Sequence, residues 1–287
     1  MKEINQYMNG KISLITGANS GIGKETAIEL AKMDSTIIMV CRNQERGEVA
    51  REEIMRQSCN DKVDLLLADL SSQNSIRQLV TEFKEKYSQL HVLVNNAGLW
   101  MINRVLTVDG LETTFAVNYL GHFLLTNLLL DVIISSAPSR IINVSSWGEM
   151  FGTINFDDLQ GEKKYGRMRA YIQSKLALIM FTYELARRLD GTGVTVNTLH
   201  PGFVRTNFFN KNTPRSLKVL TRLLFPLVIN VKKGVRTVIY LASSQEVEKV
   251  TGKYFINCRE RKSSKKSYDT LVQNRLWTIS EELTGLK

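Results

Sequence analysis

Tyr171 and Lys175 have the residue types and the spacing to do chemistry together. They stand four positions apart in "AYIQSKLALIM", within a predicted helix over 169–189, so their side chains lie on one helix face, one turn apart. A free tyrosine, with a pKa of about 10, is a poor base at neutral pH. A neighbouring ammonium favours the phenolate, so the pair suits proton exchange with an alcohol or a ketone. The alternative is a chance pair of surface neighbours.

Two further polar residues are candidates for the same chemistry. Ser146 is the last residue of "SRIINVSS", a predicted strand over 139–146, and its hydroxyl is suited to bind a carbonyl oxygen. Ser145 would point the other way if the strand geometry continues. Asn118 lies in a long helical region over 111–134, where asparagine competes with the backbone and favours a local distortion. Asn118 would then hold water or polar backbone, unless it is an ordinary residue on the helix face.

The stretch "TGANSGIG" (16–23) follows an apolar strand and precedes a helix. A helix N-terminus offers free N–H groups to an anion, and glycines let the backbone approach a pyrophosphate closely. The loop therefore predicts a dinucleotide site, with a plain strand–helix turn as the alternative. The residues expected at the ligand are Gly17, Asn19, Ser20, Gly21, Ile22 and Gly23.

Residues at the ends of the next strands refine this prediction. Arg42 stands where NAD-binding proteins commonly carry an acid, and its guanidinium suits the extra phosphate of NADP. We therefore expect NADP(H) rather than NAD(H), although Arg42 could also be a solvated charge. Asp69 and Leu70 follow the third strand, where a carboxylate can accept from the adenine amino group. Asn95, Ala97 and Gly98 of "NNAG" would receive the ribose, with Asn95 as the polar anchor; a loop cap is the alternative.

Short apolar strands alternating with helices must position these residues. Strands are predicted at 11–15, 35–41, 63–69, 91–96, 139–146, 193–202 and 252–256, and helices at 21–33, 44–57, 71–87, 111–134, 169–189 and 232–243. The alternation predicts an α/β protein with a doubly wound parallel sheet of about seven strands and helices on both faces. Ligands of such sheets bind outside the carboxyl ends of the strands, where these motifs lie.

Composition limits the alternatives. The 287 residues, 43% of them hydrophobic, have no linker-like interruption, so one domain over 1–287 is expected. No segment is typical of a signal peptide or a transmembrane anchor, and three widely spaced cysteines suggest neither a disulfide framework nor a metal site, which favours the cytoplasm. The chain has a net charge of +10, but its sequence contains no motif typical of nucleic-acid-binding proteins, so we expect no nucleic-acid partner.

The order of "TGANSGIG", "NNAG", Asn118, Ser146, Tyr171, Lys175 and "HPGFVRT" resembles the short-chain dehydrogenases/reductases over about 11–255. The resemblance implies a Rossmann-like fold and hydride transfer to or from a nicotinamide. It makes Tyr171 the acid/base, Lys175 the group that lowers its pKa and holds the ribose, Ser146 the orienting group and Asn118 part of a water-linked relay. Tyr171, Lys175, Pro201, Gly202, Val204 and Thr206 would also contact the cofactor. A homodimer or homotetramer is typical of the family.

Ser146 and Tyr171 are 25 positions apart, more than in most members, and the intervening segment resembles the retinol dehydrogenase/WW-domain oxidoreductase-like branch. Tyr165 in this segment is a weaker rival because it has Arg169, not a lysine, four residues on. Trp100 and Met101 after "NNAG" are further candidates to face the substrate.

Residues 207–231 are expected to form a substrate lid, and 257–287 a C-terminal extension. Phe208, Phe209, Leu220, Leu224 and Phe225 would line an apolar pocket, with a helix packed on the domain as the alternative. Four cations in this segment also allow weak contact with a membrane surface.

The sequence thus favours an NADP-dependent oxidoreductase acting on a small apolar carbonyl or alcohol, retinal-, aldehyde- or steroid-like. The alternative is a catalytically idle sensor or scaffold that binds the same cofactor.

Overall fold

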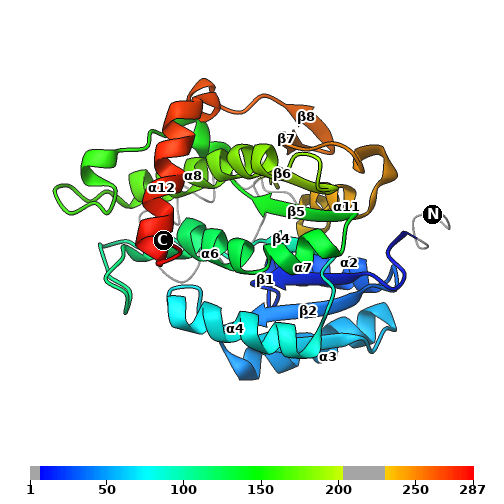
Figure 1. Cartoon of the computed structure of the whole chain (residues 1–287). Coiled ribbons are helices and arrows are strands. Elements are labelled where there is room, and N and C mark those ends of the chain that lie inside the picture. The colour runs from blue at the N-terminus through cyan, green and yellow to red at the C-terminus, as the bar shows by residue number, and fades with distance from the viewer. Residues whose placement is uncertain (1–6, 203–229) are drawn as a thin grey trace.

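The computed structural model describes residues 7–202 and 230–287. It contains one eight-stranded sheet with the order β3-β2-β1-β4-β5-β6-β7-β8 (Figure 1). All neighbouring strands are parallel except the last pair. The strands are β1 (Ile12–Thr16), β2 (Thr36–Cys41), β3 (Val63–Leu67), β4 (Val92–Asn95), β5 (Ser139–Val144), β6 (Val194–His200), β7 (Lys253–Ile256) and β8 (Arg259–Arg261).

The seven predicted strands are present as β1 to β7, and β8 is additional. It turns back along β7 through Asn257 and Cys258, both at positive φ (52° and 60°). Two such residues make the tight turn that matches the twist of a hairpin. Glycine at the second position is the usual signal of that turn, and this sequence has cysteine there.

Helices join the strands, as predicted, but the region 111–134 is not one helix. It divides into α5 (Thr113–Phe115), a π-helical segment (Ala116–Leu120), α6 (Gly121–Leu128) and α7 (Leu130–Ser135). The other α-helices among the described residues are α2 (Gly21–Ala31), α3 (Gln44–Ser58), α4 (Gln73–Lys86), α8 (Arg167–Arg188), α10 (Val231–Gly234), α11 (Arg236–Ser243) and α12 (Thr270–Thr284). Short 3-10 turns occur at Trp147–Phe151, Phe156–Asp158, Gln245–Val247 and Lys265–Tyr268.

Two hydrophobic cores lie on opposite faces of the sheet. Strand residues alternate between them: Leu14 belongs to the core with α4, α6 and α8, whereas Ile15 belongs to the core with α2, α3 and α11. Helices α4, α6 and α8 lie on the near face of the sheet in Figure 1. This alternation is expected of a sheet buried on both sides.

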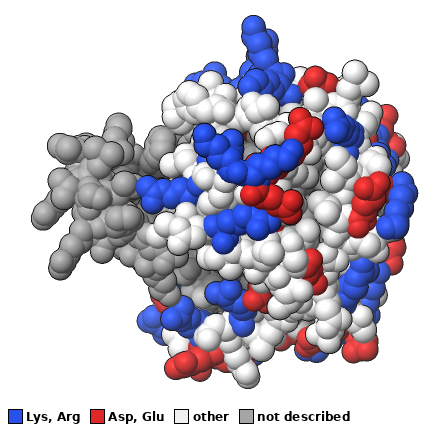
Figure 2. Space-filling view, turned by 90° about the vertical axis from the view of Figure 1, so that its left-hand side faces the viewer, with Lys and Arg blue, Asp and Glu red and all other residues white. Residues whose placement is uncertain are grey.

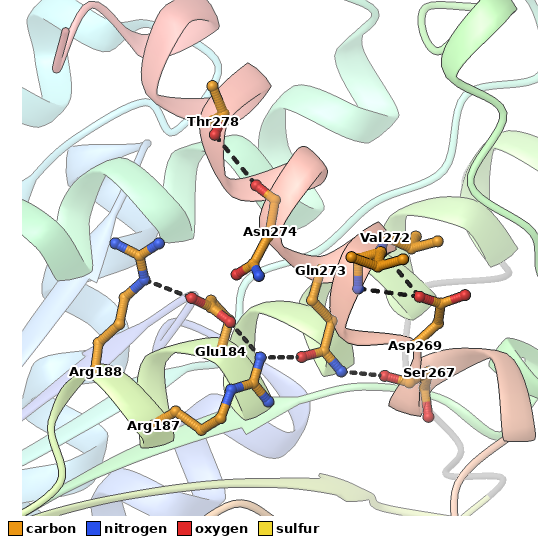
Figure 3. Close-up of polar contacts among 10 residues, drawn as sticks. Glu184, Arg187, Arg188, Ser267, Asp269, Val272, Gln273, Asn274 and Thr278 are labelled. Atoms are coloured by element: carbon orange, nitrogen blue, oxygen red, sulfur yellow. Dashed lines mark hydrogen bonds and ion pairs between the residues drawn. The ribbon is translucent and has the colours of Figure 1, made fainter.

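Helix α12 crosses the outside of α6 and α8 (Figure 1). Trp277 packs against Phe123 and Phe181, with ring centroids 5.0 and 5.8 Å away. Polar contacts add to this packing at the end of α8, where the Glu184 carboxylate accepts from Arg187 and Arg188, and Arg187 also donates to Gln273 of α12 (Figure 3). Of the predicted C-terminal extension over 257–287, β8 therefore joins the sheet and α12 joins the helical layer.

The strand order places the candidate site. From β1 the chain proceeds outward through β2 to β3, and then crosses to β4 on the other side of β1. Such a reversal leaves a crevice at the carboxyl ends of the two strands on either side of it. The glycine loop follows β1 and "NNAG" includes the end of β4, so both motifs lie at this reversal. Within the described ranges, no helix is long and apolar enough to cross a membrane.

Candidate active site

Lys175 lies on the buried side of α8 and points toward the end of β5. Its side chain is 4% exposed, and Nζ donates to the carbonyl oxygen of Val144 at 2.9 Å. Burial lowers the pKa of the Lys175 ammonium to about 8. Burial therefore brings the pKa of this ammonium close to the neutral range, and its hydrogen bond goes to a backbone carbonyl oxygen rather than to a carboxylate.

Tyr171, one turn earlier on α8, is half-buried and hydrogen-bonds with Ser146. Burial raises the pKa of the Tyr171 hydroxyl, and the bond with Ser146 opposes that rise. The expected lowering of this pKa by Lys175 is not present in the protein alone. The Lys175 ammonium bonds to backbone, and burial of the phenol outweighs the bond that favours its charged form.

The two serines after β5 point in different directions, as the strand alternation predicts. Ser145 is buried and donates to the carbonyl oxygen of Lys175 at 2.9 Å. Ser146 has extended backbone, is half-buried, and accepts from Gly148 N at 3.4 Å. His200 supports this turn by accepting from Trp147 N at 3.1 Å, and burial lowers its pKa to about 4, which keeps it neutral. Its part in the turn was not foreseen.

Asn118 occupies the π-helical segment, which is the predicted local distortion. It is fully buried: Oδ1 accepts from Leu99 N, and Nδ2 donates to Leu99 O, both at 2.8 Å. Nδ2 also donates to Ser174 Oγ on α8 at 3.0 Å. Both amide hydrogens are thus engaged by protein. Of the two roles considered, holding polar backbone is the one that the geometry shows.

Gly98 brings these groups together at the carboxyl edge of the sheet. A Cβ at this exposed position would lie 3.4 Å from Asn118 Oδ1 and 3.5 Å from Lys175 Nζ. The missing side chain therefore leaves space directly beside two candidate catalytic residues. A ribose or a planar nicotinamide ring fits a cradle of this kind, which a larger residue would fill.

The glycine loop has the backbone that its residue types predict. Gly17 and Gly21 have φ of +68° and +55°, a region that L-residues rarely adopt. A Cβ at Gly23 would lie 2.4 Å from Gly17 O, so glycine there lets α2 begin against the loop. Exposed Ser20 precedes the helix, and no side chain caps its first turn. These N–H groups are available to an anion, with Asn19 and Ile22 half-buried beside them.

Thr16 and Asn96 hold this loop, and sequence reasoning did not single them out. Thr16 Oγ1 accepts from Asn96 N at 2.9 Å and from Ala97 N at 3.0 Å, while Asn96 Nδ2 donates to Thr16 O at 2.8 Å. The ends of β1 and β4 are thereby tied together. Their position inside "TGANSGIG" and "NNAG" was the available signal.

Arg42 and Asp69 lie side by side at the carboxyl ends of β2 and β3, 3.7 Å apart between Nη1 and Oδ2. The Arg42 side chain is 70% exposed, so the ion pair is weak and the guanidinium can turn to another anion. Asp69 Oδ1 accepts from the backbone N and the hydroxyl of Ser71. Leu70, by contrast, is 7% exposed and packs in the core, so its side chain does not face the crevice.

Asn95 requires a correction. Its side chain is fully buried and donates to Thr126 Oγ1 at 2.9 Å and to Asn143 Oδ1 at 2.8 Å. It therefore links β4, β5 and α6 inside the protein instead of anchoring a ribose. A strand end directs alternate side chains to opposite faces, and at Asn95 the inward face holds a polar network.

Tyr165 and Trp100 are both engaged by contacts within the protein. Tyr165 donates to Met101 O at 3.0 Å and bonds Glu112, so it holds the segment after β4. Trp100 is 5% exposed and lies under Arg167, which rules out its indole as an open substrate surface, while Met101 stays half-buried. Pro201 and Gly202 are half-buried after β6. Val204, Thr206 and the pocket candidates of the 207–231 segment lie outside the described residues.

The surface beside Ser146 is apolar. Trp147, Met150 and Phe151 in the turn after Ser146, and Met168 at the start of α8, are each at least 40% exposed. The rings of Trp147 and Phe151 meet edge to face with centroids 5.3 Å apart. Figure 2 shows the molecule from the left-hand side of Figure 1, where Lys and Arg side chains gather with acidic ones among them.

Comparison with known proteins agrees with this geometry. A family model described as short chain dehydrogenase matches residues 11–216. Retinol dehydrogenase 14 of Homo sapiens is 46% identical over 97% of this chain and 88% of its own length.

Solved structures share the fold. The crystal structure of an uncharacterized protein from Mycobacterium paratuberculosis has a TM-score of 0.78 and 32% identity, covering 97% of this chain and 94% of its own. The Pseudomonas aeruginosa RhlG/NADP active-site complex has a TM-score of 0.70 and 25% identity, covering 87% of this chain and 96% of its own.

Proposed function

Because the chain belongs to the short-chain dehydrogenase/reductase family, in its retinol dehydrogenase-like branch, we propose that it interconverts an apolar carbonyl and its alcohol with NADP(H). The observation that carries the proposal is the meeting of Ser146, Tyr171, Lys175 and Asn118 at one edge of the sheet. An arrangement that only binds a nucleotide has no use for a tyrosine hydroxyl joined to a serine beside the crevice.

The proposed reaction assigns one task to each side chain. A bound nicotinamide supplies or accepts the hydride. In reduction, the Tyr171 hydroxyl donates a proton to the carbonyl oxygen; in oxidation, its phenolate accepts the proton of the alcohol. Ser146 is already hydrogen-bonded to Tyr171 and would orient the same substrate oxygen. Lys175 would hold a ribose hydroxyl beside Gly98 and add positive charge that favours the phenolate.

Preference for NADP rests on Arg42. A guanidinium at the end of β2, paired loosely with Asp69, can bind the additional phosphate with two parallel hydrogen bonds. NADP in the RhlG complex is consistent with this choice.

An apolar substrate is favoured by the exposed aromatic and methionine side chains that follow Ser146. The retinol dehydrogenase relative supports a retinal-like compound, and long aliphatic aldehydes or steroids have the same apolar character. We place the reaction in the cytoplasm, where three unpaired thiols would stay reduced.

Turnover tests the proposal directly. Purified protein is incubated with NADPH or NADH and with all-trans-retinal, aliphatic aldehydes, a ketosteroid and a quinone, and loss of reduced nicotinamide is followed by absorbance. Consumption of NADPH with an apolar carbonyl is expected. Tight NADPH binding without turnover of any compound would instead identify an idle sensor.

A further inference from the structure

His122 is buried between the candidate catalytic residues and the two loops that flank the crevice. It is the second residue of α6, four positions after Asn118, and is fully buried. Its Nδ1 lies 3.2 Å from the carbonyl oxygen of Asn118, and its Nε2 lies 3.2 Å from Thr16 Oγ1. The ring therefore spans from the π-helical segment to the end of β1.

The two contacts assign the tautomer. A carbonyl oxygen only accepts, so Nδ1 carries the hydrogen and donates to Asn118 O. The Thr16 oxygen already accepts from Asn96 N and Ala97 N, so its own hydrogen is available to Nε2. The other acceptor within reach, Val94 O, is farther, at 3.4 Å. Burial and the nearby Lys175 charge lower the pKa of His122 to about 3, which agrees with a neutral ring.

This one ring connects three parts of the site. Thr16 precedes Gly17 of the glycine loop, Ala97 precedes Gly98, and Asn118 bonds both Leu99 and α8. The ring is fully buried and so contacts no ligand itself. Its hydrogen bonds instead fix the distance between the loops that would hold the dinucleotide and the helix that carries Asn118.

We propose that His122 is a positioning residue, whose two hydrogen bonds hold the Asn118 segment in register with the glycine loop and "NNAG". This inference rests on the proposed function, because the register matters for aligning a nicotinamide with Tyr171. A small misplacement of reacting groups is costly, about 100-fold in rate for 1 Å.

The test compares substitutions that remove one or both bonds. His122→Phe keeps the ring volume and removes both; His122→Asn keeps a donor for Asn118 O, and His122→Gln keeps an acceptor for Thr16. The matched control is His91→Phe, since half-buried His91 accepts from Ile12 N at 3.1 Å at the opposite end of β1. NADPH binding is measured by fluorescence and hydride transfer by single-turnover kinetics.

We expect His122→Phe to slow hydride transfer by about 10- to 100-fold and to weaken NADPH binding, with partial recovery in the Asn or Gln variant. His91→Phe should leave both quantities close to wild type. Equal kinetics in His122→Phe and His91→Phe, with lost stability as the only effect, would overturn the inference. If His122→Phe does not fold, the rate of hydride transfer and the NADPH affinity of the Asn and Gln variants are compared with those of His91→Phe instead.

A second measurement does not depend on activity. Nitrogen-15 NMR of the three histidines, assigned by substitution, should show a neutral Nδ1–H ring for His122 at pH 7. An Nε2–H tautomer or a charged ring would contradict the two hydrogen bonds assigned to His122, from Nδ1 to Asn118 O and from Thr16 Oγ1 to Nε2. A wild-type protein that binds no NADPH would overturn the proposed function, and this inference with it; an active wild type with the wrong tautomer would overturn only the latter.

Discussion

Tyr171 is the residue on which the proposed chemistry depends most. Tyr171→Phe removes the hydroxyl and retains the ring, so turnover should fall by at least about 100-fold, the usual contribution of a proton donor. NADPH binding should change little. Steady-state kinetics and fluorescence titration measure the two effects.

Tyr165→Phe is the matched control, because this neighbouring hydroxyl donates to Met101 O and is given no catalytic role. Full activity in Tyr171→Phe, or an equal loss in both variants, would contradict the assignment of the acid/base.

Arg42→Asp should change the choice of cofactor. A charge-assisted hydrogen bond to a phosphate contributes about 1.5–3 kcal/mol, so the ratio of kcat/KM for NADPH over NADH should fall at least about tenfold. This ratio is measured for wild type and for Arg42→Asp with the same carbonyl substrate. Arg56→Asp makes the same charge change in the last turn of α3 and should leave the ratio unaltered. An unchanged ratio in Arg42→Asp would mean that Arg42 is only a surface charge.

His200 makes the protein sensitive to acid. Its pKa is lowered to about 4 in the folded state, against about 6.5 when unfolded. Between these two pKa values the His200 imidazole is protonated in the unfolded chain but neutral in the folded protein. The free energy of unfolding therefore falls as pH decreases from about 6.5 to 4. The loss from this residue is about 3 kcal/mol.

Urea unfolding at several pH values measures that loss. His200→Asn keeps an acceptor for Trp147 N but does not titrate, so its stability should depend less steeply on pH than that of wild type. Parallel curves for the two proteins would contradict the assigned titration.

At the scale of elements, α12 contributes packing that the sequence did not reveal. Trp277 is 5% exposed, contacts two aromatic rings and lies under the Arg188 guanidinium at 3.9 Å. Trp277→Ala should cost about 3–5 kcal/mol of folding free energy, because it leaves a large cavity. Leu271→Ala on the same helix, at 80% exposure, should cost little. Urea denaturation compares them, and similar losses would show that α12 packs loosely.

The strands and most helices follow from hydrophobic periodicity because both faces of the sheet are buried. The π-helical segment and β8 do not follow in the same way. The first depends on contacts of Asn118 with Leu99 and Ser174, which are distant in sequence. The second depends on two residues at positive φ without a glycine. Helix α12 has a sequence signal in Asp269, which accepts from Leu271 N and Val272 N at its start, and in Gly285 at its end.

At the scale of the molecule, the sequence predicts which motifs meet but not what each side chain does there. The predicted parallel sheet puts these motifs at the carboxyl ends of its strands, and Gly98, Asn118 and Lys175 do meet at that edge. Whether a strand-end side chain points outward or inward depends on the opposite face, which is why Asn95 was misplaced. Tyr171 illustrates the same limit, since the pKa of its hydroxyl depends on burial, which spacing does not reveal.

Helix α12 also bears on the order in which the site is completed. Ser280 hydrogen-bonds the Tyr119 hydroxyl at 2.7 Å, next to Asn118, and Arg77 of α4 donates to the carbonyl oxygens of Thr284 and Gly285. A ribosome makes α12 after every element that it contacts. Until then the aromatic rings of α6 and α8 remain open to solvent and to chaperones, and Tyr119 lacks its partner. A nascent chain halted before Thr270 would therefore hold every candidate catalytic residue and still lack the helix that packs against the aromatic rings of α6 and α8.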